Sequence, residues 1–179
     1  DGSVVYDSDA SEFMTVLQKS QPSVSSLSGI LPSYTVFAAS LPLGGLEAYT
    51  DAYDSYLDSR QMLQKNNVAK KSLSGKAGVH PDDLMASIGV REVAVASFMA
   101  GGKLETVNLL RTGKDIPEVL FKGTEGFSKK NYVPAVHSWP YAGFTASVFG
   151  NLFSRKDETC FTWMNGWVIS GSMKAVEEY

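Results

Sequence analysis

The segment Thr159–Tyr179, TCFTWMNGWVISGSMKAVEEY, limits the possible folds of this chain more than any other. Asn165-Gly166 lies between two apolar runs, and both residues tolerate the positive φ angles that a type I′ turn requires. The pattern therefore predicts an antiparallel hairpin in which Trp163 faces Val168. Aromatic–aliphatic pairs of this kind stabilise a sheet by roughly 0.2–1 kcal/mol each.

The start of the chain repeats the second half of this segment. Gly2–Val5 aligns with Gly166–Ile169, and Ser8 aligns with Ser172, which we expect to cap a helix that begins at Met173. A short helix is stable only when its apolar side covers a sheet. We therefore expect Gly2–Val5 to join the same sheet, or an equivalent place in a neighbouring lobe, and both helices to pack on one face. The repeat also predicts a longer parent protein with strand–helix units in tandem.

Apolar periodicity and turn signals predict the remaining elements. The predicted helices span residues 9–20, 46–65 and 81–88, with a short helix at 115–121. The further predicted strands span residues 34–41, 91–99, 104–111, 132–137 and 142–149. Gly101-Gly102 suits a tight hairpin, whereas the polar stretch 66–79 predicts a loop or a ragged helix end. Because hairpins predominate, we expect a single α+β domain over residues 1–179, with a mainly antiparallel sheet built from hairpins and helices packed on one face.

Composition excludes several classes of function. The 179 residues are 44% hydrophobic and 20% charged with a net charge of −3, as in ordinary soluble globular proteins. The densest basic runs are Lys70-Lys71 and Lys129-Lys130, so we expect no nucleic-acid partner. No apolar run approaches the roughly 18 residues of a membrane-spanning helix. The single cysteine, Cys160, excludes an internal disulfide and a multi-cysteine metal site, and a small buried side chain is its simplest role.

Two histidines are the candidates for catalysis. His80 precedes Asp82 and Asp83, which loosely resembles an acid–base cluster or half of a metal site, but helix capping explains this pattern without a reaction. No second set of ligands stands at a recognised spacing, so we expect no metal and no cofactor. His137 could join a serine and an acid in a hydrolase triad, although the chain has no G-x-S-x-G motif.

Aromatic side chains are the candidates for ligand binding. Trp139, Tyr141 and Trp167 could offer stacking faces to a sugar or a peptide. Trp163 and Trp167 lie on opposite faces of the predicted hairpin, so at least one of them should be core.

Three tyrosines, Tyr49, Tyr53 and Tyr56, share one face of the predicted helix 46–65. This spacing favours core packing with hydroxyls at the rim, because buried aromatic residues supply most packing area. A ligand platform is the alternative.

Three segments carry a resemblance to a known family. They are LPSYTVFAASLPLGGLEAYTDAYDSYL, HPDDLMASIGVREVAVASF and NGWVISGSMKAVEEY. Together they resemble an uncharacterised group of secreted or lipid-anchored bacterial proteins, similar to the domain of unknown function DUF3352. In that pattern a helix that begins with Pro and Asp precedes a strand that contains Glu-Val-Ala, here Glu92-Val93-Ala94. A closing strand then leads through a small residue and a serine into a helix. The resemblance implies an extracytoplasmic location and implies no active-site residues.

These observations favour a non-enzymatic domain of the cell envelope or a secreted one, with a binding or scaffolding role and a protein or a glycan as partner. Two alternatives remain open. One is a hydrolase that uses His137 with a serine and an acid, and the other is a carbohydrate-binding module that uses Trp139 and Tyr141.

Overall fold

The computed structural model describes residues 13–19, 23–113, 115–122, 127–155 and 157–179. These residues form a six-stranded sheet in which every neighbouring pair is antiparallel. The strands are β1 (Thr35–Pro42), β2 (Glu92–Ala100), β3 (Lys103–Arg111), β4 (His137–Ser138), β5 (Cys160–Met164) and β6 (Trp167–Gly171), in the order β1-β2-β3-β6-β5-β4. The strand that the repeat predicts at Gly2–Val5 lies outside the described residues.

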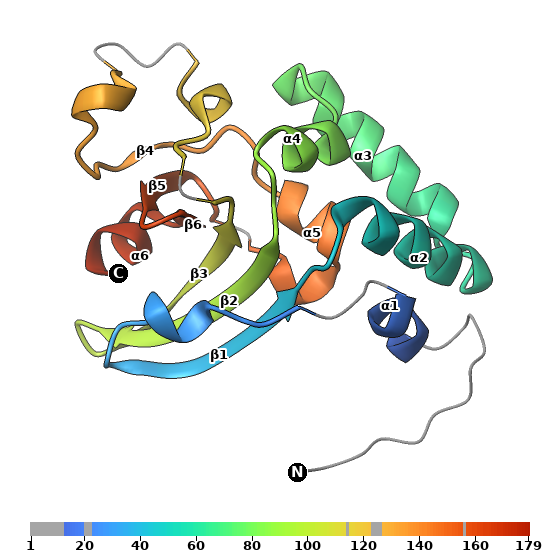
Figure 1. The fold of residues 1–179 in the computed structure, drawn as a ribbon, viewed down its shortest axis with the longest axis horizontal. Helices are drawn as coiled ribbons and strands as arrows, with labels where there is room; N and C mark the ends of the chain where they lie inside the picture. Colours follow the sequence, from blue (N-terminus) through green and yellow to red (C-terminus); the bar gives the residue numbers. More distant parts are fainter. Residues whose placement is uncertain (1–12, 20–22, 114, 123–126, 156) are drawn as a thin grey trace.

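Helices and 3₁₀ turns connect and cover the strands (Figure 1). The α-helices are α1 (Phe13–Lys19), α2 (Leu46–Ser59), α3 (Leu63–Ala77), α4 (Pro81–Ser87), α5 (Phe144–Phe149) and α6 (Met173–Glu178). The 3₁₀ turns are η1 (Leu27–Gly29), η2 (Glu118–Phe121), η3 (Lys129–Asn131) and η4 (Asn151–Phe153). The predicted α+β class and antiparallel sheet are confirmed.

Both predicted hairpins form with two-residue turns. Asn165 and Gly166 have φ angles of 51° and 85°, and Trp163 pairs with Val168 as expected. The glycine pair between β2 and β3 likewise has positive φ angles. Ser172 caps α6, because its hydroxyl accepts a hydrogen bond from the Ala175 N–H at 3.1 Å.

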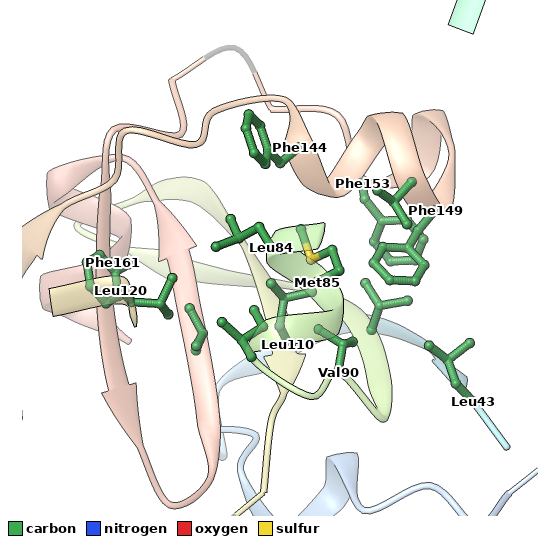
Figure 2. Packing of buried hydrophobic residues seen from close by; sticks show 14 of the residues in the cluster. Leu43, Leu84, Met85, Val90, Leu110, Leu120, Phe144, Phe149, Phe153 and Phe161 are labelled. Atoms are coloured by element: carbon green, nitrogen blue, oxygen red, sulfur yellow. The ribbon is translucent and has the colours of Figure 1, made fainter. Parts of the chain in front are cut away.

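The sheet separates two hydrophobic cores. The larger core lies between one face and helices α1, α2, α4 and α5, and it includes Tyr49. Leu84, Leu110 and Phe161 also belong to this core (Figure 2). The smaller core lies on the other face, where η1 and α6 cover side chains such as Phe98. The helices therefore do not all pack on one face as predicted. The reason is that β2 and β6 are apolar on both sides, and each side needs cover.

Two segments have a different secondary structure from the one that the sequence predicts. Residues 66–79 are mostly helical, because α3 runs to Ala77, and Lys70 is buried where it bonds Asp82 of α4. Residues 144–149 form α5 and not a strand, since a short run that is buried on nearly every side has no period that separates the two structures. Of the predicted strand 132–137, only His137 lies in a strand, because β4 spans His137–Ser138.

A buried carboxylate joins the two hairpins. Glu158 is 1% exposed and accepts hydrogen bonds from Asn108 Nδ2 at 3.1 Å, Ser170 Oγ at 2.6 Å and the Gly143 N–H at 3.2 Å. Asn108 and Ser170 are cross-strand partners on β3 and β6. Burial raises the pKa of the Glu158 carboxyl, and the three donors with Arg155 oppose this rise. One side chain thus links β3, β6 and the start of α5.

Substitution of Gly166 tests the β5–β6 turn. An alanine Cβ at Gly166 would lie 2.6 Å from the Gly113 carbonyl oxygen, and the positive φ adds strain. At Gly102, φ is also positive (75°), but in the described part of the chain a Cβ meets open space. We expect Gly102→Ala to lower the free energy of unfolding by about 1 kcal/mol, from strain alone, and Gly166→Ala to lower it at least twice as much. Urea unfolding measures both, and equal losses would show that the Gly113 contact is unimportant.

The raised pKa of Glu158 predicts a pH-dependent stability. The folded protein holds this proton to a higher pH than the unfolded chain, so the stabilisation is fully present below the unfolded pKa and is lost as the pH rises through the folded pKa. The Glu158→Gln variant cannot lose the proton. Urea unfolding at a series of pH values should therefore show a smaller decline for the variant as the pH rises from about 4.5 towards neutrality. Parallel pH profiles would contradict the assigned shift.

Candidate functional site

An apolar pocket of about 400 Å³ opens beside the edge strand β1. Four parts of the chain form its walls: α1, β1, α2 with the turn that follows it, and the end of α5 with η4. The residues that line it, here called the tyrosine pocket, are Phe13, Leu17, Ala39, Ser40, Leu41, Tyr53, Tyr56, Leu57, Met62, Phe149, Gly150, Asn151, Leu152 and Phe153. Pockets for small ligands have volumes of roughly 300–1,000 Å³, so this one has a suitable size.

A row of stacked rings along α2 forms one wall. Tyr53 stacks on Tyr49 with ring centroids 5.8 Å apart and on Tyr56 at 6.0 Å. Tyr49 is fully buried and its hydroxyl donates to the Phe149 carbonyl at 3.3 Å, which ties α2 to α5. Phe13 of α1 meets the Tyr56 ring edge-on at 5.6 Å. The helical spacing of the tyrosines thus produces a rigid wall in which only the first ring is core.

The opposite wall comes from the end of α5. Phe149 and Phe153 meet edge-on at 6.3 Å, and both are buried (Figure 2). Gly150, between them in sequence, has a φ of 102°, and a Cβ at this position would lie 3.2 Å from the Tyr53 hydroxyl. Glycine therefore leaves room for the tyrosine ring.

The chemistry of the tyrosine pocket is neutral and apolar. None of its described lining residues carries a charge, and the rim residues Met62 and Leu152 are 45% and 54% exposed. Within the described part of the chain, the hydroxyls of Tyr53 and Tyr56 make no hydrogen bond. Burial raises the pKa of Tyr53, so its hydroxyl stays protonated and can donate. The pocket combines apolar walls with two available hydroxyls.

The three ligand candidates from the sequence lie elsewhere. Trp139 is 3% exposed in the larger core, and Trp167 is 4% exposed in the smaller core, so the sheet separates them. Tyr141 is half-buried and meets Trp139 edge-on at 5.2 Å. The structure brings Trp139 and Tyr141 together, but the indole ring offers no open stacking face.

His137 lies among aromatic rings and not in a triad. Its ring meets Phe121 edge-on at 5.0 Å and lies 5.5 Å from Phe161. Its Nε2 is buried and has no hydrogen-bond partner among the described residues, and burial lowers its pKa. Within the same residues, no serine hydroxyl or carboxylate bonds to His137.

The His80 cluster has a structural role. His80 Nδ1 lies 3.5 Å from Asp82, which bonds the buried Lys70 at 2.9 Å and so holds α4 against α3. Burial raises the pKa of Asp54 on α2, and Lys70 opposes this shift. Among the described residues, no group of three or more His, Cys, Asp or Glu side chains is placed to hold a metal ion.

Sequence reasoning missed most of the tyrosine pocket. The tyrosine periodicity was a partial signal, because it allowed a ligand platform as the alternative to core packing. The remaining walls come from α1, from β1 and from residues 149–153, which lie far apart in the sequence. No local pattern shows that these segments meet.

Comparison of the chain with family models, curated proteins and solved structures found no match in any of the three. The similarity to DUF3352 therefore stays a prediction. In the described part of the chain, no helix has both the length and the apolar character needed to cross a bilayer.

Proposed function

We propose that this chain is a non-enzymatic, extracytoplasmic binding domain that holds a small apolar ligand in the tyrosine pocket. The tyrosine pocket is the observation that carries the proposal: a concave apolar site with two hydroxyls that have no other described partner. The extracytoplasmic location rests on the resemblance to secreted and lipid-anchored proteins.

The physical argument concerns the surface that a ligand would bury. Each square ångström of apolar surface removed from water contributes roughly 25 cal/mol of favourable free energy. A molecule that fills the pocket therefore gains binding free energy from its contact with every wall. A charged group has no counterion among the described lining residues and would lose its hydration. The pocket therefore favours a neutral apolar chain or ring, and the Tyr53 and Tyr56 hydroxyls can orient one polar end.

The alternatives have weaker support. A hydrolase needs a nucleophile and an acid near His137, and the described residues place only aromatic rings there. A glycan site needs an open aromatic face, which the buried Trp139 does not supply. A protein partner could insert an apolar side chain into the tyrosine pocket, but concave shape and volume favour a small molecule.

Binding of Nile red, a neutral apolar dye, tests the proposal. Its emission should increase on binding to the wild-type chain, and decanol should displace it. Ala39→Leu adds volume inside the pocket and should weaken dye binding at least tenfold. Ala69→Leu makes the same change on an exposed part of α3 and should have no effect. Absence of binding, or equal binding by the two variants, would contradict the proposal.

Tyr53→Phe tests the orienting role of the hydroxyl. The ring and the apolar walls remain, so Nile red should bind as before. Decanol should displace the dye several-fold less effectively, because its hydroxyl loses a hydrogen-bond partner. Unchanged displacement would show that this hydroxyl does not contact the ligand.

A further inference from the structure

A second and larger cleft, of about 880 Å³, lies at the end of the sheet where β2 begins and β3 ends. The η1 segment and the β5–β6 turn complete its walls. Its lining includes Arg91, Arg111, Trp163 and Trp167, and the site is here called the arginine cleft.

Strand register brings the backbones of the two arginines together. Arg91 immediately precedes β2, its N–H donates to the Arg111 carbonyl at 2.8 Å, and Arg111 is the last residue of β3. Nineteen residues of hairpin separate them in sequence, yet the pairing of β2 with β3 makes their backbones neighbours. The side chains of both arginines line the same cleft at this end of the hairpin.

Neither guanidinium forms a hydrogen bond with a carboxylate of the described residues, and Arg111 makes only a long ion pair. Arg91 is exposed and has no ion pair among the described residues. The acid nearest to Arg111 is the buried Glu92, at 3.9 Å. The Glu92 carboxylate already accepts from Ser25 Oγ at 2.5 Å, and from the Ser26 N–H at 3.0 Å and its hydroxyl at 3.2 Å. The N–H donors of both arginines are therefore available to a ligand.

The other charge at the cleft is directed outward. Asp115 is 92% exposed and lies 3.9 Å from Lys129, which partly balances its charge. Trp163 is half-buried, and its Nε1 donates to the Thr112 hydroxyl at 3.3 Å, which fixes the ring at the cleft wall. The cleft thus combines two arginine side chains with the aromatic surface of Trp163.

We propose that the arginine cleft binds a small organic oxyanion, a carboxylate or a phosphate ester, through Arg91 and Arg111. The planar guanidinium groups present paired N–H donors that match the two oxygens of such an anion. The half-buried Trp163 indole is the aromatic surface that contacts the organic part of the ligand. This site is separate from the tyrosine pocket in residues and in ligand charge, so the two proposals stand or fall independently.

Calorimetric titration with phenyl phosphate, benzoate and neutral benzyl alcohol tests the proposal. At least one of the two anions should bind, and benzyl alcohol should not. Binding should also change the tryptophan emission, because two of the three tryptophans in the chain line the cleft. Affinity for benzyl alcohol equal to that for the anions, or no binding of either anion, would overturn the proposal.

Three variants locate the binding. Arg91→Gln alters an exposed side chain and should weaken anion binding about tenfold without loss of thermal stability. Arg111→Lys keeps the positive charge beside Glu92 but removes the paired donors, and should weaken binding to a similar extent. Lys103→Gln makes an equal charge change at the other end of β3 and should leave the affinity unchanged. An equal effect of Lys103→Gln, or no effect of either arginine variant, would assign the binding to general electrostatics or to another site.

Discussion

The pairing of β3 with β6 is the interaction on which the rest of the structure depends. It joins two hairpins that each form from local sequence, and it brings together Asn108 and Ser170, which both donate to Glu158. A carboxylate without these donors would be costly to bury, so the geometry of the two hairpins and the position of Glu158 are mutually dependent. Through the Gly143 N–H the same carboxylate fixes the start of α5, and hence one wall of the tyrosine pocket.

The local parts of the fold could be predicted from the sequence, and the non-local parts could not. Asn165-Gly166 and Gly101-Gly102 set turn type and register within a few residues, so both hairpins were correctly placed. The extent of α3 depends on Lys70, which is polar in sequence but is buried through its bond to Asp82. The type of α5 depends on packing against the larger core, because six residues with little polar character do not specify a period.

The same contrast between local and non-local features applies to the candidate sites. Aromatic content suggested Trp139 and Trp167, but large aromatic side chains are also the residues that a core most needs, and both are buried. The tyrosine spacing identified one wall of the tyrosine pocket, whereas Ala39 and Phe149 reach it only through tertiary packing. Arg91 and Arg111 lie apart in sequence, and only the β2–β3 register brings them to the same cleft.

A continuous set of contacts connects the two sites. The Ser40 hydroxyl at the tyrosine pocket lies 3.2 Å from the Ser25 hydroxyl, and Ser25 in turn donates to Glu92. Glu92 is the acid beside Arg111 of the arginine cleft. Coupling between sites needs contiguous contacts and an element with two arrangements. The contacts are present, and the segment that carries Ser25 leads into η1, which lines the cleft. Glu92 is therefore the residue at which the contacts from the two sites converge.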